Sequence, residues 1–93
     1  MDSRKEQFTR IYEEYIDKIY RFVYVKVNSE EVAQDITSKV FMKGWEAFKS
    51  SEKGLENPKA FLYQVARNAV IDHYRAEGRS KTVSLASVAA HYK

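Results

Sequence analysis

The feature that most constrains this chain is its shortage of turn-forming residues. Its 93 residues include one proline and three glycines, and no segment alternates strongly between apolar and polar residues. Because sheet folds need frequent turns and alternating strands, the sequence favours long helices. A chain of this length forms one domain and buries only about 60–65% of its unfolded surface, so a large enclosed catalytic cleft is not expected.

Apolar residues recur at spacings of three and four, which predicts three helices. The first covers about residues 3–27, with its apolar stripe running from Phe8 to Val23. Asn28 and Ser29 break the pattern, and Ser29 is suited to cap a second helix over about residues 30–49. Asn57 and Pro58 are typical of an N-cap followed by a first helical residue, so a third helix is expected over about residues 58–77.

The ends of the third helix complete the predicted organisation. Residues 50–57 are polar, contain a glycine and are expected to form a loop, while Gly78 is expected to end the third helix. The fold class is therefore predicted to be all-α, a three-helix bundle over residues 1–79. Residues 80–93 are expected to be a linker or flexible tail, with a helical turn from Leu85 onward as an alternative, because they are rich in small residues and weakly patterned.

Several kinds of site are not expected from this composition. Cysteine is absent, so the chain has neither disulfides nor thiolate metal sites. The N-terminus is charged and shows no signal peptide, and no membrane span is visible, so a cytoplasmic location is expected. Asp72 and His73 lie about 100° apart on a helix with no glycine-rich phosphate loop beside them, so we expect no enzyme, cofactor or metal.

The charge is distributed unevenly along the chain. Residues 1–27 carry six basic and five acidic residues, residues 28–57 carry four and six, and residues 58–93 carry six and two. The net charges are therefore +1, −2 and +4, and the positive charge gathers in the last third. This polarity indicates one surface for a polyanion and another for a different partner, although chance would also explain charges this small.

The polar residues of the third helix are unusual for a solvated face. One edge holds Asn68, Asp72, Arg75 and Arg79, and an adjoining edge holds Lys59, Tyr63 and Arg67. Arginine binds phosphate, asparagine binds base edges and an exposed tyrosine would stack on unpaired bases, so the set favours nucleic acid. The alternative is structural: Asp72 pairs with Arg75 and Asn68 points into water. His73 is expected to be packed or partly exposed, not a ligand.

Three segments together resemble a known family. They are F-T-R-I-Y-E-E-Y-I-D-K-I-Y-R-F (residues 8–22), D-I-T-S-K-V-F-M-K-G-W (residues 35–45) and P-K-A-F-L-Y-Q-V-A-R-N-A-V-I-D-H-Y-R (residues 58–75). In this order they are similar to domain two of bacterial sigma factors of the extracytoplasmic-function (ECF) type, whose third motif is roughly P-x-x-W-L-x-x-I-A-R-N-x-x-I-D-x-x-R. Each motif alone would be a weak match.

The resemblance implies a transcription initiation module with two binding surfaces. One would bind the coiled coil of the largest subunit of RNA polymerase core through Asp35, Ser38, Lys39 and Met42. The other would capture the non-template strand of promoter DNA, with residues 50–57 as a pocket for an extruded base. Its implied DNA-binding residues are Lys53, Asn57, Lys59, Tyr63, Arg67, Asn68, Asp72, Arg75 and Arg79. An anti-sigma factor is a further partner that the resemblance implies.

The sequence also departs from the family pattern. Ser38 and Lys39 stand where the family usually has glutamine and an acidic residue, and Lys39 reverses a charge at the expected polymerase surface. The helix-turn-helix domain of complete members has no counterpart after Arg79, which predicts an excised domain or a naturally short relative. A rival function stays open, in which the basic helix binds an acidic regulatory protein and not DNA.

Overall fold

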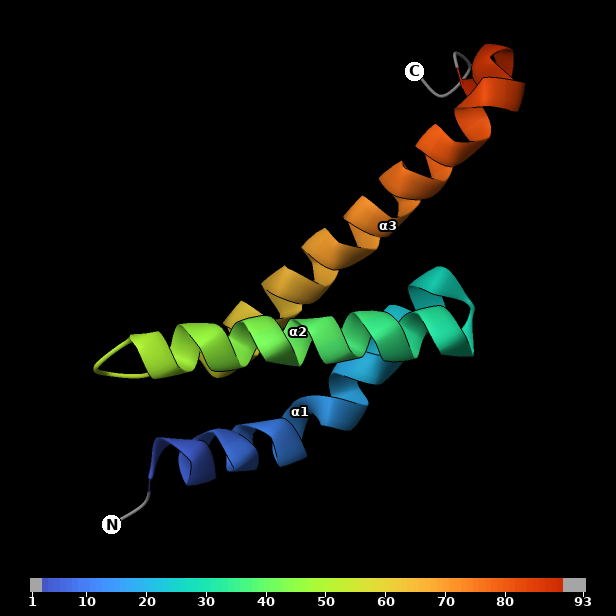
Figure 1. Ribbon diagram of the computed structural model, residues 1–93. Helices are drawn as coiled ribbons and strands as arrows, with labels where there is room; N and C mark the ends of the chain where they lie inside the picture. The colour runs from blue at the N-terminus through green and yellow to red at the C-terminus, as the bar shows by residue number, and fades with distance from the viewer. Residues whose placement is uncertain (1–2, 90–93) are drawn as a thin grey trace.

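Three helices account for the architecture of the chain (Figure 1). The computed structural model describes the backbone of residues 3–89 and the side chains of residues 3–78. The helices are α1 (Arg4–Val27), α2 (Glu30–Ser50) and α3 (Pro58–Ala89), and each contacts the other two. The described residues contain no strand. The predicted all-α three-helix bundle is therefore confirmed.

Local capping explains where each helix begins. The Ser3 hydroxyl accepts from the backbone N–H of Glu6, and the Glu6 carboxylate accepts from the backbone N–H of Ser3, which closes a capping box. Ser29 accepts from the backbone N–H of Val32 at 3.2 Å. Asn57 Oδ1 accepts from the backbone N–H of Ala60 at 3.1 Å, directly before Pro58. The caps predicted at Ser29 and Asn57 are confirmed.

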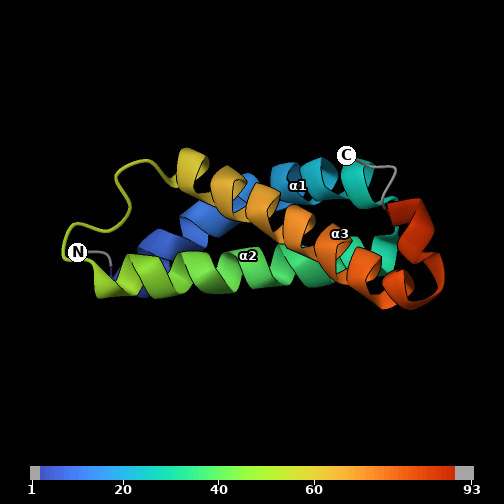
Figure 2. The same ribbon diagram turned by 90° about the horizontal axis from the view of Figure 1, so that it is seen from above.

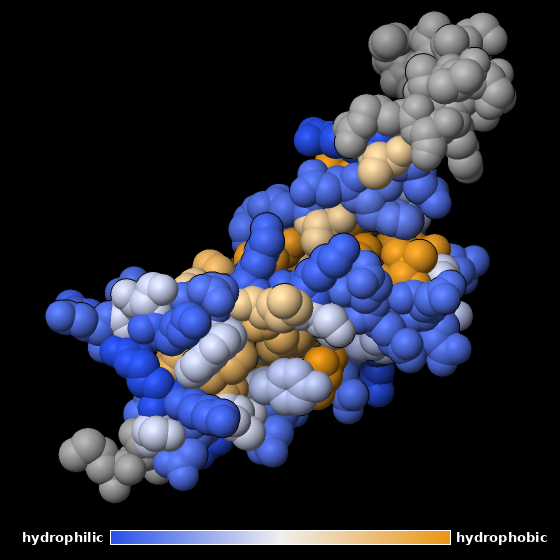
Figure 3. All heavy atoms as spheres, viewed as in Figure 1, coloured by the Kyte–Doolittle hydropathy of each residue, from blue (hydrophilic) through white to orange (hydrophobic). Residues whose placement is uncertain are grey.

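The core lies where the apolar stripes of the three helices meet. Ile19, Val23, Val40 and Leu62 are completely buried. Phe8 of α1 packs against Phe48 of α2 at 5.6 Å between ring centres, and its ring also contacts those of Phe41 and Trp45. The remaining buried apolar residues are Ala33, Ile36, Ala66 and Val70. Figure 3 shows hydrophobic residues gathered along the middle of one face, framed by hydrophilic ones.

Close packing of α2 against its neighbours depends on Gly44. A Cβ atom at this position would lie 3.1 Å from Leu62 and 3.2 Å from Phe8, closer than ordinary van der Waals contact. The glycine therefore lets α1 and α3 approach the same turn of α2, because no side chain separates them. This packing sets the position of α3, which carries most of the predicted DNA-binding residues.

The predicted end of the third helix was wrong. Gly78 was expected to stop α3, but the helix continues to Ala89. A glycine stops a helix when it adopts the left-handed conformation, and among the described glycines only Gly54 has a positive φ. Gly78 keeps a helical backbone, so its weak helix propensity does not end α3. Figure 1 shows the orange-to-red part of α3 leaving the bundle formed with α1 and α2, and Figure 2, seen from above, shows α3 running diagonally across the other two helices.

Part of the predicted tail therefore belongs to α3. Residues 80–89 are helical, and residues 90–93 lie outside the described residues. Across the part of the chain that the structure describes, no helix combines the length and apolar character that crossing a membrane requires.

Candidate functional site

The surface of α3 presents a row of exposed polar residues. Arg67, Asn68 and Arg75 are all exposed. Asn68 Oδ1 accepts from Gln64 Nε2 at 3.4 Å, and Arg75 Nη1 lies 4.0 Å from Asp72 Oδ1. Both contacts are long and solvent-exposed, and exposed pairs of this kind contribute about 0.2–0.5 kcal/mol. A ligand therefore displaces them at little cost.

Tyr63 does not offer the exposed ring that the sequence predicted. It is half-buried, and its ring stands edge-to-face against Phe22 of α1 with 5.1 Å between centres. The prediction placed Tyr63 on a helix edge but had no information on which residue of α1 covers that edge. The exposed aromatic ring of α3 is instead Tyr74, at 48% exposure.

Tyr74 was missed by sequence reasoning, although it lies one residue before Arg75. Its hydroxyl donates to the backbone carbonyl of Lys26 near the end of α1. The last carbonyls of a helix lack partners within the helix, so this bond satisfies one of them and fixes the orientation of the ring. Tyr74 lies seven residues, about two helical turns, after Arg67, and this spacing is the signal that would have placed it on the same edge of the helix.

The loop between α2 and α3 is short and internally bonded. The backbone N–H of Gly54 donates to the carbonyl of Ser51 at 3.2 Å, and Leu55 packs against the core. Lys53 is exposed, as is Lys59 in the first turn of α3. Asn57, which was predicted to bind DNA, uses its side-chain oxygen to cap α3.

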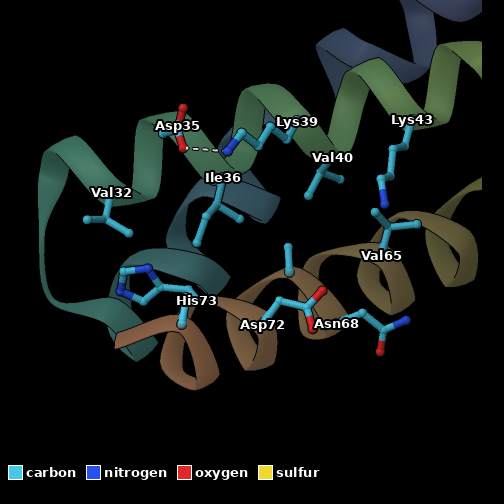
Figure 4. Close-up of a pocket in the computed structure, with 12 residues that line it drawn as sticks. Val32, Asp35, Ile36, Lys39, Val40, Lys43, Val65, Asn68, Asp72 and His73 are labelled. Carbon is cyan, nitrogen blue, oxygen red and sulfur yellow. Dashed lines mark ion pairs between the residues drawn. The ribbon is translucent and has the colours of Figure 1, made fainter. Parts of the chain in front are cut away.

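The exposed stripe on α2 divides between two grooves. Asp35 and Lys39 lie on the groove between α2 and α3, which has a volume of about 470 Å³ (Figure 4). Ser38 and Met42 lie on a second groove between α1 and α2, next to Tyr12 and Trp45. Met42 is 65% exposed. The four residues predicted to bind polymerase are therefore exposed, as expected, but they face two different neighbours.

The α2–α3 groove also brings together the two predicted surfaces. Asn68 and Asp72 line it from α3, opposite Asp35 and Lys39 on α2 (Figure 4). The Lys39 ammonium pairs with the Asp35 carboxylate at 3.1 Å, and both side chains are about two-thirds exposed. The carboxylate that the resemblance assigns to polymerase is thus already paired with the lysine that departs from the family pattern.

Two further predictions on α3 concern His73, which was expected not to be a ligand, and Arg79, which was expected to bind DNA. His73 is half-buried and its Nε2 lies 3.7 Å from the carboxylate of Glu77, so it is packed as expected. The described residues hold no group of three or more potential metal ligands. The side chain of Arg79 lies outside those that the structure describes.

The comparisons with known proteins identify the family. A family profile described as Sigma-70 region 2 matches residues 11–80. The chain belongs to the sigma-70 region 2 family. It is 31% identical over 71 residues to an ECF RNA polymerase sigma factor of Streptomyces coelicolor, BldN, across 76% of this chain and 27% of that protein. It is 32% identical over 74 residues to the ECF RNA polymerase sigma factor SigM of Bacillus subtilis, across 80% of this chain and 44% of that protein.

The match to region 2 and the two relatives confirm the resemblance to domain two of ECF sigma factors. The chain spans less than half the length of either curated relative. No solved structure gives a significant match to it. The matched residues 11–80 include the exposed polar residues of α2 and α3, all residues that line the α2–α3 groove and most of those that line the α1–α2 groove.

Proposed function

We propose that this sigma region 2 binds RNA polymerase core through α2 and captures the unpaired non-template strand of a promoter with α3 and the α2–α3 loop. The observation that carries the proposal is the exposed row of Arg67, Asn68 and Arg75 on α3, in a chain matched by the region 2 profile. Their contacts within the protein are weak, so they are available to nucleic acid.

The loop and α3 carry charges of opposite sign, which suit them to different parts of the DNA strand. The loop contains Glu52, Lys53 and Glu56 and carries a net charge of −1, which does not suit phosphate. Carboxylates accept from base amino groups such as that of cytosine. The arginines of α3 suit the phosphate backbone. We therefore assign the backbone to α3 and an extruded base to the loop. Base extrusion costs a few kcal/mol, which a fitted pocket and stacking offset.

The aromatic ring of Tyr74 and the side-chain amide of Asn68 add further contacts to this assignment. Tyr74 takes the stacking role that was expected of Tyr63, because its ring is exposed and its hydroxyl is fixed to α1. Stacking on a protein ring contributes about 1–3 kcal/mol per base. Asn68 provides both a donor and an acceptor for a base edge. DNA capture in this form requires no chemical step by the protein.

The polymerase surface is formed by α2. Asp35, Ser38, Lys39 and Met42 are exposed on it, and Met42 adds a large flexible apolar contact. A cation on polymerase must compete with Lys39 for the Asp35 carboxylate, since these two already pair. We therefore expect Lys39→Ala to strengthen polymerase binding and Asp35→Ala to weaken it.

The DNA half of the proposal is tested in the complex with polymerase core. The probe is a duplex whose non-template strand ends in a random single-stranded overhang, from which bound sequences are selected and then titrated. Asn68→Ala and Arg75→Ala should each weaken capture of the selected overhang about tenfold, the effect of losing roughly 1.4 kcal/mol. Arg21→Ala, which removes an exposed arginine from α1, is the matched control and should change little.

Salt dependence separates the proposal from its rival. Log affinity for single strands falls with log salt by about 0.7 for each phosphate contact. Arg75→Ala should lower this slope by about that amount, whereas Asn68→Ala should leave it unchanged. Alanine is the better helix former, so a loss of affinity in Asn68→Ala does not come from a weakened α3. Unchanged capture in both variants would remove the DNA assignment and favour an acidic protein partner of the anti-sigma type.

A further inference from the structure

Arg4 occupies a position that local electrostatics does not favour. It is the first residue of α1, where the helix carries partial positive charge and a cation is unfavourable. Its side chain reaches across the molecule to the end of α2. Nη1 donates to the carbonyl oxygen of Phe48 at 2.8 Å, and Nη2 donates to the carbonyl oxygen of Glu52. A residue at the start of the chain therefore holds both sides of the point where α2 passes into the loop.

The electrostatics of α2 explains this contact. The Phe48 carbonyl lies in the last turn of α2, which carries partial negative charge, and it also accepts a long bond of 3.4 Å from the backbone N–H of the C-cap residue Ser51. The guanidinium therefore suits the C-terminus of α2, although it is attached to the N-terminus of α1. Both of its acceptors are backbone atoms. The contact thus fixes the path of the main chain independently of the side chains in the loop.

The Phe48 ring joins this contact to the middle of the loop. The Arg4 guanidinium carbon lies 5.6 Å from the centre of the ring. Gly54 packs against the same ring, because a Cβ atom on Gly54 would lie 2.7 Å from it. Gly54 also has a φ of 75°, which side-chain-bearing residues rarely adopt. We call Arg4, Phe48 and Gly54 the loop clamp.

We propose that Arg4 is a positioning residue for base recognition by the loop. The inference rests on the proposed function, in which residues 51–57 receive the extruded base. Arg4 acts through the loop backbone and needs no contact with DNA. A pocket that discriminates among bases must hold its donors and acceptors within about 0.5 Å of the required geometry, and the loop clamp fixes the main chain that carries Glu52 and Lys53.

Arg4→Lys is the discriminating variant, because lysine keeps the charge but lacks the planar fork that reaches two carbonyls. Arg4→Ala removes charge and contacts together. Lys5→Ala is the matched control, since it removes the neighbouring exposed charge. The first readout is hydrogen exchange of the Gly54 amide in the isolated chain. It should accelerate about tenfold in both Arg4 variants, as expected for the loss of one charge-assisted hydrogen bond, and remain unchanged in Lys5→Ala.

The second readout is base preference in the complex with polymerase core. The selected overhang is compared with overhangs that differ at the preferred base, and the ratio of affinities is measured at several salt concentrations. In Arg4→Lys the ratio should fall at least about fivefold, while the salt slope and the affinity for polymerase stay unchanged. A purely structural role would lower the melting temperature and leave this ratio intact.

The two readouts together decide whether Arg4 is a positioning residue. A reduced ratio together with faster loop exchange supports the positioning role. Faster exchange of the Gly54 amide with an unchanged ratio of affinities overturns the positioning role. Unchanged exchange of this amide overturns it as well. A lower salt slope in Arg4→Ala but not in Arg4→Lys, with the ratio of affinities intact in both variants, would show direct phosphate binding in place of positioning. Failure of the wild-type complex to capture any overhang would overturn the proposed function itself, and the inference with it.

Discussion

The two connections in this molecule link successive helices in different ways. The α1–α2 connection is formed by Asn28 and Ser29, and its geometry is local: Asn28 is left-handed with φ 52°, and Ser29 caps α2. The α2–α3 connection covers residues 51–57 and is held by Arg4, which is 44 residues from Phe48 in sequence. The distant residue Tyr74 reaches only the end of α1 beside the short connection, whereas Arg4 bonds to Glu52 within the longer one. The connection assigned a binding role is thus the one that a distant residue contacts directly.

The largest effect should come from Gly54→Ala. A side chain there must adopt a left-handed backbone and also displace the Phe48 ring. The strained backbone and the displaced ring together should lower the free energy of unfolding by about 2–4 kcal/mol, measured by urea denaturation. Gly78→Ala is the control, because nothing lies within 4 Å of its added Cβ. A loss below about 0.5 kcal/mol in Gly54→Ala would show that the loop clamp does not define the longer connection.

An intermediate effect is expected for the helix caps on the two connections. Ser29→Ala and Asn57→Ala each remove a side-chain acceptor from the first turn of a helix. Each should lower the free energy of unfolding by about 1 kcal/mol in the same denaturation experiment. Equal losses would show that the two connections share their capping chemistry and differ only in the long-range contact. A negligible loss for Asn57→Ala alone would mean that α3 does not depend on its cap.

The smallest effect should be that of Asn28→Gly. Asparagine already occupies the left-handed region, and glycine adopts it without steric strain. The greater freedom of glycine in the unfolded chain opposes this gain, so stability should change by less than about 0.5 kcal/mol. A thermal melt compared with that of Gly54→Ala measures the contrast. A large loss would indicate that the Asn28 side chain makes a contact essential to the short connection.

The difference between the connections also explains what the sequence could predict. Caps at Ser29 and Asn57 are determined by neighbouring residues, and the spacing of Phe8, Ile19 and Val23 determines the buried face of α1. Such signals span only a few residues, so periodicity and capping rules locate them. The three-helix bundle followed from them.

The remaining features depend on contacts between distant segments. Phe22 covers Tyr63, Lys26 binds the Tyr74 hydroxyl and Arg4 holds the loop. No local pattern encodes these pairs, since each joins residues at least 40 positions apart. The mistaken stop at Gly78 has a different cause: glycine permits a helix end but does not require one.

The most direct test of the account is a titration of this chain against RNA polymerase core enzyme. Asp35→Ala is compared with Glu46→Ala, because both remove the acidic member of an exposed ion pair on α2. We expect saturable binding that Asp35→Ala weakens about tenfold and Glu46→Ala leaves unchanged. Absence of saturable binding by the folded chain, or equal losses in the two variants, would contradict it.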